Sequence, residues 1–149
     1  SGLIWTAGTK ALLPEIIPKP NLINGKIRVD SSLHAIGYEN FMAIGDVSFH
    51  EEIPYPATAQ SAMQQGEFVA NTLMLSNKVL SKKSFKFNDL GEMVSLGIGQ
   101  ASITALGLTI SGSIAFQIRR ITYLTKFPQV SLSLRSMIAW LLGNLKNVN

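Results

Sequence analysis

Two short segments in the first half of the chain hold the residues best suited to chemistry. In the first, an apolar run from Phe41 to Ile44 leads directly into Gly45 and Asp46. A strand that ends in Gly-Asp presents a carboxylate at its C-terminal edge, where open α/β sheets bind ligands. Glycine lets a ligand approach the backbone closely, and the carboxylate accepts hydrogen bonds from sugar or ribitol hydroxyls. This segment therefore predicts a ligand-binding turn.

The second segment is a predicted helix from about Ala57 to Ser76, preceded by Pro56 and with Thr58 as a candidate N-cap. One of its faces carries almost no large side chains, because small residues recur on it at helical spacing: Ala59, Ala62, Gly66 and Ala70. Such a face admits either a packed sheet or a flat ligand, and the sequence leaves both open.

Other chemistries are excluded or disfavoured. The chain has no cysteine, so disulfide, thiolate-metal and thiol-redox chemistry are absent from it. His34 and His50 lack the spacing of metal ligands, and we expect no metal site. Gly97-Ile98-Gly99 imitates the start of a dinucleotide fingerprint, but the third glycine and the later acidic residue are missing. We interpret it as a coincidence.

The chain resembles the type II NAD(P)H dehydrogenases, which are single-subunit flavoprotein NAD(P)H:quinone oxidoreductases. The resemblance spans nearly the whole chain, which corresponds to the C-terminal third of such an enzyme. The residues of its motifs are most similar to those of the cyanobacterial and plastid branch, whose plastid members reduce demethylphylloquinone. The segments that carry it are Leu3–Gly8, Phe41–Asp46, Thr58–Gly66, Phe87–Met93 and Arg119–Leu124.

The resemblance implies FAD as cofactor, contacted by Gly45, Asp46, Thr58, Ala59, Gln60 and Ala62. It also implies a quinone substrate, for which Gln60 and Gln64, four residues apart on one helix face, are the candidate catalytic residues. The family's two Gly-rich fingerprints are N-terminal and absent here. We therefore expect the missing part to bind NAD(P)H, and this chain alone to bind FAD poorly.

The implied fold is an α+β fragment of a glutathione-reductase-like flavoprotein with two dinucleotide-binding domains. Residues 1–77 would end the FAD-binding domain, and residues 78–149 would form a small β-rich and helical domain facing membrane and quinone. Charge follows the same division, with four basic and seven acidic residues before residue 78 and nine basic and two acidic residues after it.

The remaining pattern predicts the elements that must position these residues. We expect a short opening strand over residues 3–6, a proline-rich loop through Pro14, Pro18 and Pro20, and a strand over residues 26–30. A β-like run at residues 85–87 follows. From Met93 to Ile118 no residue is charged, but glycines and hydroxyl residues interrupt the run, so buried antiparallel strands and then a helix from about Ser113 are favoured over a membrane span.

The C-terminal segment from Val130 to Leu145 has the period of an amphipathic helix, flanked by Trp140, Arg135 and Lys146. This is the composition of a helix lying in a membrane interface, although packing on the core or in a homodimer gives the same pattern. We expect peripheral membrane association, at the cytoplasmic face or the thylakoid side. The alternative function is a non-catalytic membrane-binding or assembly module. Nucleic acid is not an expected partner, because the basic residues lack interleaved aromatics.

Overall fold

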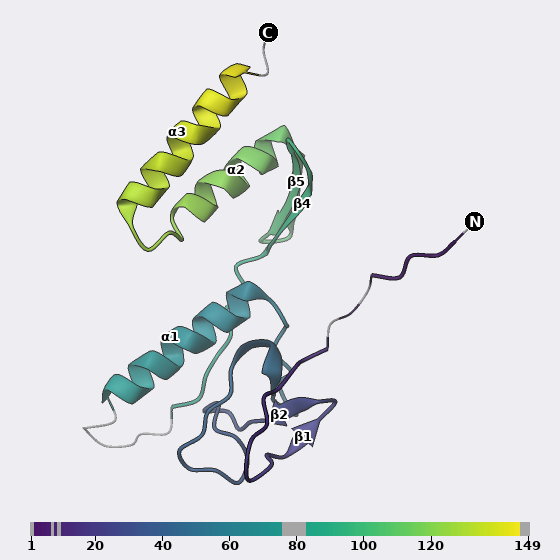
Figure 1. Ribbon diagram of the computed structural model, residues 1–149, viewed down its shortest axis with the longest axis vertical. Coiled ribbons are helices and arrows are strands. Elements are labelled where there is room, and N and C mark those ends of the chain that lie inside the picture. Colours follow the sequence, from purple (N-terminus) through teal and green to yellow (C-terminus); the bar gives the residue numbers. More distant parts are fainter. Residues whose placement is uncertain (1, 7, 9, 76–82, 147–149) are drawn as a thin grey trace. The chain divides into compact units, whose positions relative to one another are not determined.

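The computed structural model describes residues 2–6, 8, 10–75 and 83–146, which form two compact units, Ser1–Asp89 and Leu90–Asn149 (Figure 1). Each unit combines helix and strand, so the chain is a small α+β structure. The division between the units falls after Asp89, whereas the sequence placed a domain boundary after residue 77.

The first unit contains a small three-stranded sheet in the order β1-β2-β3. β1 (Leu22–Ile23) pairs antiparallel with β2 (Lys26–Arg28), and β2 pairs parallel with β3 (Ser48–Phe49). Asn24 and Gly25 join β1 to β2 with φ of 53° and 76°, as a two-residue hairpin turn of this kind requires. The strand predicted over residues 26–30 is confirmed for residues 26–28, with Val29 in an isolated bridge to Ala35 and exposure alternating along the segment.

The core of this unit combines apolar side chains from loops as well as from strands. Leu33 is fully buried and Phe85 is 5% exposed. Phe68 and Val69 of α1 (Ala59–Leu75) pack against the same cluster, which fixes the helix to the unit. The buried members of the cluster are Ile27, Val29, Leu33, Ala35, Ala43 and Phe85.

The second unit is a meander of three antiparallel strands followed by two helices (Figure 1). Its strands are β4 (Glu92–Gly97), β5 (Gln100–Ala105) and β6 (Leu108–Gly112). α2 (Ser113–Leu124) contacts β5 and β6, and α3 (Val130–Lys146) lies beside α2. The antiparallel strands, the helix starting at Ser113 and the C-terminal helix are thus confirmed.

Two expected strands are absent from the described residues. Residues 2–6 form no regular element, and Leu3, Ile4 and Trp5 are 78% to 89% exposed, so the opening strand was wrong. A single apolar strand needs a neighbouring strand for its backbone hydrogen bonds, and the described part of the chain offers none there. Residues 85–87 also lie outside any ladder, where Phe85 instead donates its amide to the Ser31 carbonyl at 2.7 Å.

Two further expectations need correction. The apolar run before Gly45 forms only an isolated bridge between Met42 and His34, because the chain then turns into the short 3-10 helix η1 (Gly45–Val47). The strands expected to be buried are largely exposed. Every residue of β4 is exposed, since α2 packs on β5 and β6.

Candidate functional site

The Gly45–Asp46 turn is held against the beginning of α1. The Gly45 amide donates to Gln65 Oε1 at 2.6 Å, and the Ser48 hydroxyl donates to the Gly45 carbonyl at 2.9 Å. Gly45 has a φ of +67°, a conformation that L side chains rarely adopt. Asp46 follows in η1 with its side chain exposed. The structure therefore presents this carboxylate from a pinned turn at the start of η1 and not from a strand end.

The small-residue face of α1 is used for packing where it meets this turn. A Cβ built on Gly45 would lie 3.4 Å from the Ala62 Cβ, and one built on Gly66 would lie 3.9 Å from Ile44 Cδ1. Ala62 and Gly66 thus let residues 44 and 45 approach the helix. Ala59 and Ala70, in contrast, are exposed. The sequence left a packed sheet and a flat ligand open as occupants, but the middle of the face is met by the turn at residues 44 and 45, which lies in no sheet.

The N-terminus of α1 is capped as the sequence predicts. The Thr58 hydroxyl oxygen accepts the Ser61 amide at 3.2 Å, three residues into the helix. No acidic residue stands in the first turn, so the positive end of the helix dipole there is not offset by a carboxylate of that turn. Ala59 is exposed and Gln60 half-buried beside this end.

The two candidate catalytic glutamines differ in their surroundings. The side-chain amide of Gln64 makes two hydrogen bonds to the backbone of Asn88. Its Nε2 donates to the Asn88 carbonyl at 2.8 Å, and its Oε1 accepts the Asn88 amide at 2.9 Å. This double hydrogen bond ties residues 83–89 to α1. A quinone carbonyl would have to displace Asn88 to reach the Gln64 amide.

Sequence reasoning missed Gln65, which is 1% exposed and carries the contact to Gly45. Its Nε2 donates to the Ser61 hydroxyl at 3.4 Å, and Ser61 is 2% exposed. The signal was available: Gln65 lies three residues after Ala62 and four after Ser61, so helical spacing puts a polar amide beside the small-residue face. A buried amide there needs partners on the packed segment.

The histidines take part in local structure. The His50 ring accepts the Ile53 amide at its Nδ1, and His34 Nδ1 lies 3.0 Å from the Ser32 hydroxyl oxygen.

Asp30 Oδ1 accepts hydrogen bonds from the Ser32 hydroxyl and from the amides of Ser32 and His34. Partial burial raises the pKa of the Asp30 carboxyl, but these hydrogen bonds and the nearby His34 outweigh it, so the pKa is lowered from 3.8. Among the described residues no group of three or more potential ligands is placed to bind a metal.

The glycine motif at residues 97–99 forms the turn between β4 and β5, with φ of +124° at Gly97 and +75° at Gly99. Ile98 between them is fully exposed. A dinucleotide fingerprint joins a strand to a helix, whereas this turn joins two antiparallel strands. Its interpretation as a coincidence is confirmed.

Aromatic rings in the second unit hold two neighbouring arginines. The Arg120 guanidinium carbon lies 4.3 Å from the centre of the Trp140 ring on α3 and 5.5 Å from that of Phe116. Arg119 lies 4.7 Å from the centre of the Tyr123 ring. The Arg120–Trp140 contact joins α2 to α3, whereas the contacts of Arg119 with Tyr123 and of Arg120 with Phe116 lie within α2. Four residues of the C-terminal apolar stripe are 41% to 56% exposed: Leu134, Met137, Ile138 and Leu142.

Within the described ranges, no helix combines the length and the apolar character that crossing a membrane demands.

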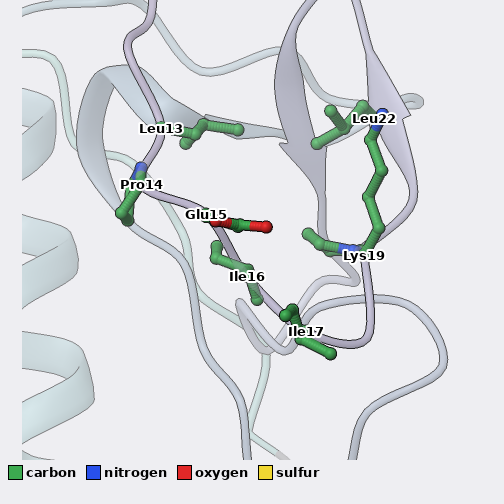
Figure 2. Close-up of a pocket in the computed structure, with 8 residues that line it drawn as sticks. Leu13, Pro14, Glu15, Ile16, Ile17, Lys19 and Leu22 are labelled. Atoms are coloured by element: carbon green, nitrogen blue, oxygen red, sulfur yellow. The ribbon is translucent and has the colours of Figure 1, made fainter.

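A hollow of about 440 Å³ lies in the first unit, formed by residues 13–22 (Figure 2). Apolar side chains make up most of its wall, and the Glu15 side chain points into it between Leu13 and Ile16. None of the candidate site residues lines it. We assign it no role in the chemistry.

Comparison with known proteins gives one consistent class. The chain is 30% identical, over 93% of its length, to the alternative NAD(P)H-ubiquinone oxidoreductase C1, chloroplastic/mitochondrial, of Arabidopsis thaliana. It is 30% identical over the same share to the demethylphylloquinone reductase NdbB of Synechocystis sp.. It is 33% identical, over 79% of its length, to the type II NADH:quinone oxidoreductase of Staphylococcus aureus. No family model matches the chain.

These matches confirm the resemblance: the chain is a relative of the type II NAD(P)H:quinone oxidoreductases. More particularly, it matches relatives from the plant and cyanobacterial branch over nearly all of its length. The chain covers 29%, 35% and 30% of these three relatives, which is about a third of each.

Proposed function

We propose that this chain is the C-terminal part of a flavoprotein that passes electrons from NAD(P)H through FAD to a membrane quinone. Residues 1–77 would complete an FAD-binding domain of the glutathione-reductase-like kind. Residues 78–149 would form the side that faces quinone and membrane. The names of the three relatives, each a quinone reductase or oxidoreductase, support the reaction class.

The observation that carries the proposal is the pinned Gly45–Asp46 turn packed on the capped start of α1. An exposed carboxylate on a rigid turn suits the hydroxyls of a ribityl chain, and the start of a helix suits the negative pole of an isoalloxazine ring. A helix N-terminus stabilises such charge by about 0.3–1 kcal/mol when exposed and up to about 2 kcal/mol when partly buried. The donor and acceptor types present therefore fit FAD.

Bound FAD would supply hydride acceptance and two-electron transfer to the quinone. Asp46 would accept hydrogen bonds from the cofactor, and the backbone at Thr58 and Ala59 would face it at the start of α1. Gly45 and Ala62 would let the turn lie close to the helix and so position Asp46 beside the cofactor. A part of the protein outside this chain would bind NAD(P)H. Gln60, in the first turn of α1, would contact the quinone.

Replacement of Asp46 tests the cofactor assignment. In the intact protein, Asp46→Ala should lower the FAD content, measured as oxidised-flavin absorbance per protein. Glu67→Ala is the matched control, because Glu67 is an exposed carboxylate on α1 away from the turn. If Asp46→Ala and Glu67→Ala retain equal amounts of flavin, the assignment fails.

Half-reaction kinetics test the quinone assignment. Gln60→Ala should slow quinone reduction more than flavin reduction by NAD(P)H in a stopped-flow experiment. Gln64→Ala should in addition release Asn88 and loosen residues 83–89, seen as faster amide exchange there. Slowing of the NAD(P)H half-reaction alone by Gln60→Ala would place Gln60 on the nicotinamide side.

We propose that the second unit attaches the protein to a membrane surface through α3. The apolar stripe from Leu134 to Leu145 rises about 17 Å at about 1.5 Å per residue, against about 30 Å for a bilayer core. Its apolar face fits the acyl boundary, while Trp140 and Arg135 suit the headgroup level. Each basic residue adds about 1 kcal/mol of attraction near an anionic surface.

Vesicle co-sedimentation decides whether the stripe binds lipid. Ile138→Asp lies in the stripe and should weaken binding of the intact protein, whereas Ala139→Asp lies on the side of Arg135 and should weaken it less. A truncation before Val130, which removes the whole stripe, should weaken binding at least as much as Ile138→Asp does. Equal binding by all variants would assign the stripe to packing on the core or on a second subunit.

A second candidate function is a non-catalytic membrane-binding or assembly module, favoured by the exposed apolar side chains of the second unit. The two candidates differ in a single measurement. The intact protein purified with a bound yellow chromophore is a flavoprotein, and the module would be colourless.

A further inference from the structure

A row of hydrogen bonds runs beneath the Gly45–Asp46 turn and ends at the N-cap of α1. Gln65 Oε1 accepts the Gly45 amide at 2.6 Å, and Gln65 Nε2 donates to the Ser61 hydroxyl at 3.4 Å. The Ser61 amide in turn donates to Thr58 Oγ1 at 3.2 Å. Gln65 and Ser61 are 1% and 2% exposed, so water does not compete with the inner bonds of this row.

The row joins the two parts of the molecule to which the proposed function assigns the cofactor. At one end is the turn that carries Asp46, and at the other is the first turn of α1. Eleven residues, 47–57, separate the two ends in sequence, and only a Cβ built on Gly45 would reach van der Waals distance of Ala62, at 3.4 Å. A directional bond is needed to fix the orientation of the turn on the helix.

We propose that Gln65 is the positioning residue of this site: it sets the orientation of the Asp46 carboxylate relative to the N-terminus of α1, and thereby the affinity for FAD. This inference rests on the proposed function. Gln65 itself lies beneath the turn and touches the cofactor nowhere; it acts through Gly45.

The side-chain type follows from what the position must supply. The Gly45 amide needs a hydrogen-bond acceptor, and the Ser61 hydroxyl accepts from a donor. The side-chain amide of Gln65 supplies both the acceptor and the donor on one planar group. Methionine has a similar length but offers no donor and only a weak acceptor. Loss of the acceptor leaves the Gly45 amide without its partner, and the turn gains freedom to reorient.

The experiment compares three variants of the intact protein with the wild type: Gln65→Met, Gln65→Glu and Phe85→Leu. Gln65→Glu keeps an oxygen acceptor for Gly45. Phe85→Leu lowers stability from the core of the same unit, where the Phe85 ring packs on Tyr55 and Phe68. FAD affinity is measured by titration of apoprotein, and amide exchange at Gly45 and Asp46 is measured in parallel.

We expect Gln65→Met to weaken FAD binding about tenfold, which corresponds to about 1.4 kcal/mol, and to speed exchange of the Gly45 amide. Gln65→Glu should recover most of the affinity, and Phe85→Leu should retain wild-type affinity although it unfolds earlier. The inference is overturned if Gln65→Met binds FAD as the wild type does, or if Phe85→Leu weakens FAD binding equally. A wild-type protein that binds no FAD would overturn the proposed function as well, which separates the two failures.

Discussion

In the unit Ser1–Asp89, apolar side chains from strands, loops and α1 are buried in one cluster, whereas the buried residues among those described in Leu90–Asn149 are Ala101 and Ala115. The larger apolar side chains of the second unit stay on its surface, with Ile114 at 67% and Leu108 at 72% exposed. The polar contacts between segments differ too. In the first unit, Gln64 and Gln65 join segments by hydrogen bonds. In the second unit, the Arg120 guanidinium joins α2 to α3 by a cation–π contact with Trp140.

This difference teaches that a high apolar content does not by itself mean a large core. Large exposed patches of apolar side chains mark contact with another surface. The first unit gains stability from the packed cluster that contains Leu33 and Phe85. In the second unit, the proposed function assigns the exposed apolar side chains of α3 to contact with lipid.

The largest change in the free energy of unfolding is expected from truncation of a core side chain in the first unit. Phe85→Ala removes a ring that packs edge-on to Tyr55 and Phe68, and should lower the free energy of unfolding by about 3–5 kcal/mol. Ile138→Ala in the second unit should change it by less than about 0.5 kcal/mol. Urea denaturation followed by circular dichroism measures both. Equal losses would mean that Ile138 is buried in the intact protein.

The same substitution should have opposite signs in the two units. Gly45→Ala forces a Cβ onto a backbone with φ of +67°, so it should destabilise by about 1–2 kcal/mol. Gly143→Ala lies within α3, where a Cβ would meet open space, and should stabilise by about 0.5–1 kcal/mol. Thermal unfolding distinguishes the signs. A loss at Gly143 would show that something packs closely against α3 there.

Loss of the Arg120–Trp140 contact between α2 and α3 should lower stability by a smaller amount. Trp140→Leu removes the ring beneath Arg120 and should cost about 0.5–1 kcal/mol, because the contact is only partly buried. Trp5→Leu is the matched control in the first unit, since Trp5 is 78% exposed and lies in no regular element. Calorimetry of the two variants should show a shift for Trp140 only.

The smallest effect expected is a pH dependence confined to the first unit. The hydrogen bonds from Ser32 and His34 lower the pKa of Asp30 in the folded chain, so stability from them is present above the unfolded value of about 4 and is lost as the pH falls through the folded value. Asp30→Asn retains the Oδ1 acceptor but does not titrate. It should flatten the acid limb of the stability curve. An unchanged limb would assign the acid loss to other carboxylates.

Sequence reasoning succeeded where one local rule governs the outcome. The Thr58 cap acts within three residues of sequence, and the glycines that interrupt the apolar run after Met93 include the two in the turn between β4 and β5, so both followed from local residue types. The prolines likewise indicated the loop near residue 18, and the apolar period indicated the C-terminal helix.

It failed where a distant segment decides the structure. The apolar run at Phe41 turned at Gly45 because α1 holds that glycine, and residues 2–6 formed no strand because the described chain has no strand beside them. The Gln64 and Gln65 contacts span about twenty residues or more in sequence. The family resemblance named Gln64 through its motif, but only the structure showed that its amide grips Asn88.

The acidic residues of the chain end at Glu92, and every histidine lies before residue 51. Beyond Glu92 the ionisable side chains are Tyr123 and the cations Arg119, Arg120, Lys126, Arg135 and Lys146. Every charged side chain beyond Glu92 is therefore cationic, and no carboxylate within this segment offsets the attraction of its lysines and arginines to an anionic surface. Salt screens such attraction over about 10 Å at 0.1 M ionic strength. The ionic strength of the medium would therefore set the distance over which an anionic surface attracts this segment.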